Sequence, residues 1–115
     1  MVIPGIEKGD GQLNITTSDN GLVAIEFDGV VQIYKVDFTE QTFTQVTELN
    51  LSNVQDIELS PSGDRLYILS NEAGGTLYEY GVTNEGVTQI KVSNNVGSDA
   101  VDIVVFDSGK VGIAA

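Results

Sequence analysis

The sequence predicts an all-β fold made of a repeated unit of four short antiparallel strands. Three observations lead to this prediction. The chain repeats itself at an interval of 42 to 46 residues, apolar residues recur at every second position within the matching segments, and glycine-containing turns fall at matching places in the copies. A period of two residues is that of a strand with one buried face, and glycine turns of this kind join antiparallel neighbours.

The repeat is clearest at the first strand of each unit. Residues 14–21 match residues 56–63 at an offset of 42, and a third copy, residues 102–109, follows after another 46. The later strands repeat in the same order, with residues 23–25 matching 66–68 and 111–113, residues 33–36 matching 77–80, and residues 43–46 matching 87–90. Matches in this order identify one structural unit that is used more than once.

Each predicted strand follows from the same alternation, as in Val23/Ile25/Phe27 and Ile57/Leu59. Between the first and second strands lie Asn20-Gly21, Ser62-Gly63 and Ser108-Gly109, which supply the positive φ that a tight hairpin requires. Glycines also mark the later hairpins, at residues 28–29, 74–75 and 84–86. The predicted strands cover residues 12–17, 22–27, 30–37, 43–49, 55–60, 65–70, 76–82, 87–92, 101–106 and 110–115.

Four antiparallel strands that repeat at about 40–50 residues are typical of β-propeller blades. We therefore expect one propeller-like domain over residues 1–115, with units at residues 11–54, 55–100 and, in part, 101–115. This division corresponds to about two and a half blades per chain.

A family resemblance supports this fold class. Residues 57–68 resemble the "FSPDGKRLYV" hairpin of the YVTN and lactonase-type propellers, and residues 75–80 resemble the strand that follows it there. The resemblance implies the blade and, as an alternative function, a relative of an enzyme that acts on sugar lactones. Because only blade-forming positions match, no site residue is carried over.

A closed propeller needs at least about four blades, so this number of strands implies completion from elsewhere. The apolar residues 111–115 carry no polar cap, and such an edge would pair with another chain. We expect a homo-oligomer, either a dimer of about five blades or a trimer of about seven and a half, of which the dimer closes more evenly. The alternatives are a piece of a larger propeller and a short stack with protected edges.

The charge of the chain argues against two other classes of partner. Seventeen acidic residues face five basic ones, and the formal net charge is -12. Such a chain would repel nucleic acid and anionic lipid, so neither partner is expected. No apolar run approaches the roughly 18 residues of a membrane-spanning helix, and the first residues do not resemble a secretory signal, which leaves the compartment open.

The catalytic repertoire is short because the chain has neither His nor Cys. Ser62 therefore lacks the base that activates a serine nucleophile, and the segment 60–64 is interpreted as a structural turn. We predict no catalytic residue, no cofactor-binding residue and no metal ligand.

Two groups of acidic residues could serve a function. Asp99 and Asp102 lie in the oxygen-rich segment between two units, where calcium could bind, but the D-x-D-x-D-G pattern is absent. Glu26, Glu58 and Glu79 lie within predicted strands, and we expect solvated positions for them rather than a catalytic carboxylate pair.

Tyr34 and Tyr78 occupy equivalent positions, which favours packing between sheets over a substrate platform. The function that this sequence favours is a non-enzymatic scaffold or protein-interaction module that uses a surface built from several blades. The alternatives are the lactonase-like enzyme named above and a surface repeat stabilised by calcium.

Overall fold

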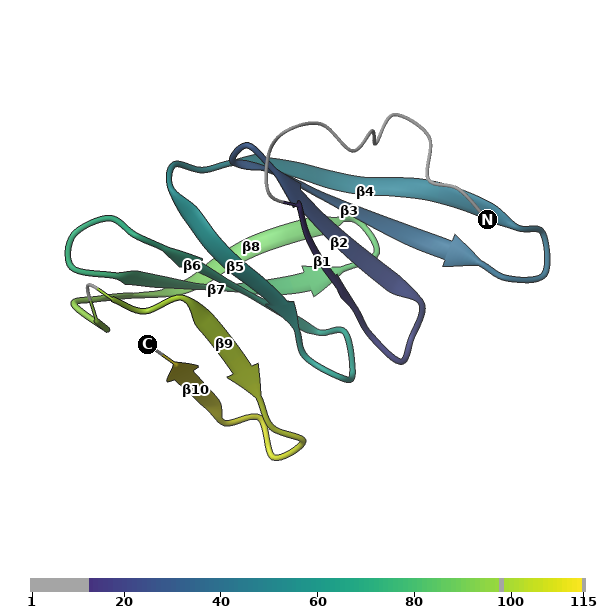
Figure 1. Ribbon diagram of the computed structural model, residues 1–115. Coiled ribbons are helices and arrows are strands. Elements are labelled where there is room, and N and C mark those ends of the chain that lie inside the picture. The colour runs from purple at the N-terminus through teal and green to yellow at the C-terminus, as the bar shows by residue number, and fades with distance from the viewer. Residues whose placement is uncertain (1–12, 98, 115) are drawn as a thin grey trace.

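The structure of the chain is a computed structural model that describes residues 13–97 and 99–114 (Figure 1). This part of the chain contains ten strands and no helix, and so no helix that could cross a membrane. The strands are β1 (Leu13–Thr17), β2 (Leu22–Phe27), β3 (Val30–Asp37), β4 (Thr42–Asn50), β5 (Val54–Leu59), β6 (Arg65–Ser70), β7 (Thr76–Thr83), β8 (Gly86–Asn94), β9 (Asp102–Val105) and β10 (Val111–Ala114).

The strands form three antiparallel sheets, each a simple meander. The orders are β1-β2-β3-β4 in the first sheet, which we call blade 1, and β5-β6-β7-β8 in the second, blade 2. Strands β9 and β10 pair as a two-stranded sheet, the half-blade. The predicted all-β class and the two four-stranded units are therefore confirmed, and each strand begins and ends within two residues of its predicted bounds.

The hairpin glycines take the predicted conformation. Gly21, Gly63 and Gly109 have φ angles of 88°, 78° and 86° at the tips of the β1–β2, β5–β6 and β9–β10 hairpins. A Cβ atom at Gly63 would also meet the end of the Asn20 side chain in the neighbouring hairpin, which would have to move. A glycine at this tip therefore allows two consecutive hairpins to pack closely.

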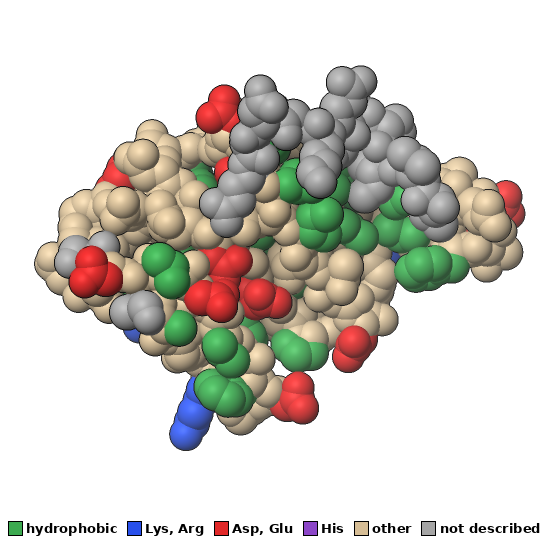
Figure 2. Space-filling model, in the orientation of Figure 1, with side chains coloured by type: hydrophobic (Ala, Val, Ile, Leu, Met, Phe, Trp, Pro, Cys, Tyr) green, Lys and Arg blue, Asp and Glu red, His purple; other side chains and the backbone are tan. Residues whose placement is uncertain are grey.

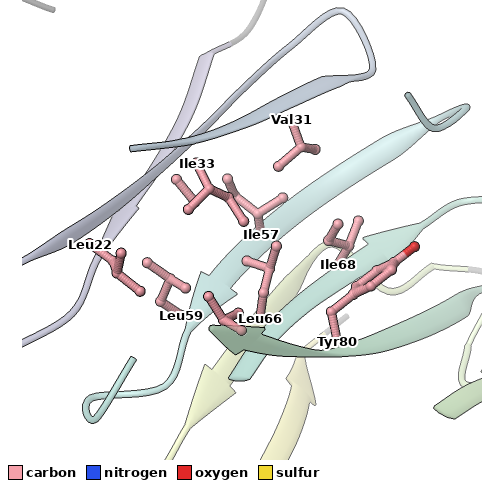
Figure 3. Packing of buried hydrophobic residues seen from close by; sticks show 10 residues of the cluster. Leu22, Val31, Ile33, Ile57, Leu59, Leu66, Ile68 and Tyr80 are labelled. Carbon is pink, nitrogen blue, oxygen red and sulfur yellow. The ribbon is translucent and has the colours of Figure 1, made fainter. Parts of the chain in front are cut away.

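Blades 1 and 2 stack face to face over a continuous apolar core. Side chains from both sheets point toward one another in this core (Figure 3), among them Leu22 and Ile33 of blade 1 and Leu59, Leu66 and Ile68 of blade 2. The first strands of the three sheets, β1, β5 and β9, lie side by side. We call them the innermost strands, because the expected propeller-like arrangement would place them nearest its axis.

Blade 2 has two apolar faces. Its leading face, with Ile57 and Leu59 of β5, packs on blade 1. Its trailing face, with Tyr67 and Leu69 of β6, packs on Ile103 of the half-blade in a second buried cluster. Alternation along each strand therefore directs one set of side chains to the preceding sheet and the other set to the following sheet.

The repeated tyrosines behave in two ways. Tyr78 packs against the core between blades 1 and 2 and stacks on Tyr80, so the predicted packing between sheets is confirmed there. Tyr34 is buried, but its ring meets Phe43 of the adjacent strand edge to face, with 6.4 Å between centroids.

Candidate functional site

The innermost strands bring one repeat position together from consecutive units. Asp56 and Asp102 occupy this position in β5 and β9, and Asn14 occupies it in β1. Asp102 lies close enough to Asp56 to help raise the pKa of the Asp56 carboxyl group. The backbone N–H of Ile103 also donates to both, at 2.8 Å from Asp56 Oδ2 and 2.9 Å from Asp102 Oδ1. This contact joins blade 2 to the half-blade through two carboxyl groups.

The environment favours a proton on this pair. Burial, the neighbouring carboxyl group of Asp102 and the charges of Asp102 and Glu58 raise the pKa of Asp56 to about 7, although the Ile103 N–H acts in the opposite direction. Burial also raises the pKa of Glu58, with a smaller contribution from the charge of Asp102. Figure 2 shows acidic side chains gathered in the middle of one face, over the place where β5 and β9 lie in Figure 1. Like charges in a half-buried site raise the cost of ionisation.

We call Asp56, Glu58 and Asp102 the carboxyl cluster. Thr16 links this cluster to blade 1. Its hydroxyl donates to Glu58 Oε1 at 3.1 Å and accepts from the backbone N–H of Leu59 at 3.0 Å. The hydrogen bond to Glu58 favours the ionised form of that residue and partly offsets the effect of burial on its pKa. The polar contacts near the innermost strands therefore run from blade 1 through blade 2 to the half-blade.

The expectation that the strand glutamates are solvated was wrong for Glu26. This side chain is 4% exposed. It accepts hydrogen bonds from Asn14 Nδ2 at 2.6 Å and from the turn N–H of Gly29 at 2.9 Å, which replace water around the carboxylate. Glu79 is half-buried as well and lies 3.4 Å from Arg65 in an ion pair.

Sequence reasoning did not single out Asp56. A signal for it was present, because the offsets of 42 and 46 align Asn14, Asp56 and Asp102 at one position of the innermost strand. The alignment shows equivalence, but it does not show that neighbouring innermost strands bring two of these side chains into contact.

The calcium hypothesis concerned Asp99 and Asp102. Asp99 is exposed in the turn before Ala100, and Asp102 begins β9 and contacts Asp56. Within residues 13–97 and 99–114 no three acidic side chains are arranged so that they could hold a metal ion.

A separate open cleft of about 840 Å³ lies at the hairpin tips. All three hairpins between first and second strands line it, with Asp19 from the first, Ser60, Ser62 and Asp64 from the second, and Phe106, Asp107 and Ser108 from the third. Arg65, Tyr67 and Glu79 line the part that lies on blade 2. None of the three residues of the carboxyl cluster lines this cleft.

The segment 60–64 forms one wall of the cleft, and hydrogen bonds within the turn hold its conformation. Asp64 Oδ1 accepts hydrogen bonds from the hydroxyls of Ser62 at 2.7 Å and Ser60 at 3.0 Å. These bonds, assisted by the neighbouring Arg65 charge, hold the pKa of Asp64 below its usual value. The Ser60 hydroxyl also accepts from the N–H of Arg65 at 3.1 Å, which ties the tip to β6.

Comparison with known proteins adds a fold relationship. No protein-family model and no curated protein matches the chain. Among solved structures, it is similar to a chain of Kuenenia stuttgartiensis hydrazine synthase, with 24% sequence identity and a TM-score of 0.68. The match covers 99% of this chain and 32% of that one, so the present chain spans about a third of its length. At this identity the likeness shows a shared fold alone.

Proposed function

We propose that the chain is a non-enzymatic, β-propeller-like scaffold that binds a protein segment on a surface assembled from several blades. The observation that carries this proposal is the composition of the cleft, which all three β-hairpin tips line. A single unit would supply only one of these walls. The site would therefore depend on the stacking of consecutive units, as composite surfaces of repeat proteins do.

The chemistry of the cleft favours a basic segment. Carboxylates of Asp19, Asp64 and Asp107 line it, and its cation, Arg65, is already paired with Glu79. The exposed ring of Phe106 offers an apolar contact beside these charges. A Lys or Arg next to an apolar side chain would match both features.

The finer relationship to the YVTN and lactonase-type propellers is part of the same proposal. Support comes from the hairpin residues 57–68, which carry the sequence resemblance and form β5, a glycine tip and β6. Support also comes from the stacking of four-stranded meanders.

Selection from a random peptide library tests the binding function. We expect the enriched peptides to carry Lys or Arg and to compete with one another for the chain. Phe106→Ala and Asp107→Asn should weaken their binding at least about tenfold, which is the scale of a modest interface contact. Ile90→Ala is the matched control, because Ile90 is an exposed apolar residue of β8 that does not line the cleft. Peptides that bind the Phe106→Ala variant unchanged would contradict the proposed site.

The carboxyl cluster favours one second candidate, a lactonase-like enzyme. A carboxyl group with a pKa near neutrality can donate and accept a proton, and Asp56 has this property. The candidate requires that the chain hydrolyse sugar lactones and that Asp56→Asn remove the activity. Absence of hydrolysis by the folded chain across a panel of lactones would eliminate it.

A further inference from the structure

The first innermost strand exposes a position that is buried elsewhere in the stack. Ile15 of β1 is 57% exposed. Its equivalents, Ile57 of β5 and Ile103 of β9, are 1% and 3% exposed, because each packs against the sheet before it. The repeat therefore buries this side chain wherever a preceding unit is present.

The half-blade exposes the complementary position at the other end of the stack. Val104 of β9 is 44% exposed, whereas its equivalent in β1, Thr16, is 6% exposed beneath blade 2. Figure 2 shows hydrophobic side chains on the surface over β9 and β10. An apolar residue on this trailing face would be covered by a following unit.

The contact between blades 1 and 2 shows which residues would meet if the two exposed end faces packed against each other. At the boundary between blades 1 and 2, Thr16 of one innermost strand contacts Leu59 of the next at 3.0 Å. By repeat position, Val104 corresponds to Thr16, and Thr17 corresponds to Leu59. Thr17 is exposed, like Val104. A unit placed against the trailing face of the half-blade would therefore bring a Thr17 next to Val104.

We infer that a second copy of this chain covers both end faces, with the trailing face of each β9 packed on the β1 of the other copy. This arrangement rests on the propeller-like scaffold proposed above and names its partner. Both halves of the interface are present on one chain, so two copies bury both at once in a ring with two equivalent head-to-tail contacts. Two copies supply six innermost strands, within the roughly four to eight blades of known propellers, whereas three copies would supply nine. Four of the six belong to complete blades and two to half-blades, so this ring differs from the five blades that the number of strands predicts.

Cysteine cross-linking tests the arrangement, because the chain contains no cysteine of its own. Thr17→Cys and Val104→Cys are prepared as separate full-length proteins, mixed and oxidised. We expect a disulfide-linked pair that contains one molecule of each variant, in at least about tenfold excess over either variant oxidised alone. Thr88→Cys, at an exposed position of β8, replaces each partner in turn as the control and should not cross-link.

Light scattering on the unmodified chain provides the independent measurement. We expect twice the monomer mass, and association that strengthens as added salt screens the net charge of -12 on each copy. A disulfide between two molecules of Thr17→Cys would indicate a symmetric contact between two β1 strands in place of the head-to-tail contact. This result would overturn the inference. A monomer at all concentrations and salt levels would overturn it as well, and would indicate that another protein or another part of a longer chain covers these faces. Peptide binding at the hairpin cleft can be measured on a monomer, so the scaffold proposal can succeed or fail separately.

Discussion

Asp56 of β5 and Asp102 of β9 occupy the same position in consecutive units, and both carboxyl groups accept a hydrogen bond from the backbone N–H of Ile103 at the boundary between blade 2 and the half-blade. Two carboxyl groups in such a site favour a proton on one of them, because two negative charges would repel each other. We therefore expect the attachment of the half-blade to depend on pH.

The first prediction concerns the pH dependence of stability. The pKa of Asp56 rises from 3.8 to about 7, so the folded chain binds this proton more tightly than the unfolded chain does. The contribution of Asp56 to the free energy of unfolding is full below about pH 4 and is lost as the pH rises through 7. Solvent screening of this half-exposed pair limits the loss to about 1–2 kcal/mol. Urea unfolding at a series of pH values measures it.

Asp56→Asn isolates this contribution. The first unit already carries Asn at the equivalent position, Asn14, and an amide can accept from Ile103 and donate to Asp102 without a shared proton. We expect the free energy of unfolding of the variant to fall much less as the pH rises, so the variant should be more stable than the parent at pH 8. Asp107→Asn removes the same formal charge from an exposed position, and its free energy of unfolding should fall with rising pH as in the parent. If the free energy of unfolding of Asp56→Asn fell with rising pH as much as that of the parent, groups other than Asp56 would be its cause.

The second prediction concerns the hydroxyl between blades 1 and 2. Thr16→Val keeps the shape of the side chain but leaves the buried N–H of Leu59 without an acceptor. We expect a loss of about 1–3 kcal/mol in the free energy of unfolding. Thr17→Val, at the adjacent exposed position, should change stability by less than about 0.5 kcal/mol. Equal effects of the two substitutions would argue against an energetic role for this contact.

The third prediction compares one repeat position in two environments. Ile57→Val removes a methyl group from the core between blades and should cost about 0.5–1.5 kcal/mol. Ile15→Val makes the same change on the exposed β1, where an effect of about 0.5 kcal/mol or less is expected. Thermal unfolding at low protein concentration, where copies are separate, gives both values. A larger effect at Ile15 would mean that β1 is buried under these conditions.

The fourth prediction concerns the close contact of two hairpin tips. Gly63→Ala places a Cβ atom against Asn20 and also strains a positive φ, whereas the equivalent Gly109→Ala meets open space and strains φ alone. The φ strain costs about 1–2 kcal/mol at either position. We expect Gly63→Ala to be the more destabilising by at most about 1 kcal/mol in urea unfolding, because the exposed end of the Asn20 side chain can move aside. Combining Gly63→Ala with Asn20→Gly should remove this difference, and persistence of the difference would locate the clash elsewhere.

The strands, the hairpins and their repetition could all be predicted from the amino-acid sequence. Alternation such as Val23/Ile25/Phe27 and the positive φ of Gly21 and Gly109 are local properties, since they depend on a residue and its immediate neighbours along the chain. This is why the strand bounds and the hairpin glycines could be predicted without knowing how the sheets pack.

The contacts between polar groups of different sheets became clear from the packing of the sheets and could not be predicted. Alternation assigned Glu26 and Glu58 to one side of a strand, but it did not show that Asn14 and the turn at Gly29 enclose one of them or that Thr16 contacts the other. The contact between Asp56 and Asp102 and the cleft at the hairpin tips likewise lie across boundaries between units. Such contacts depend on the distance and rotation between stacked sheets, and no pattern within a single repeat specifies those quantities.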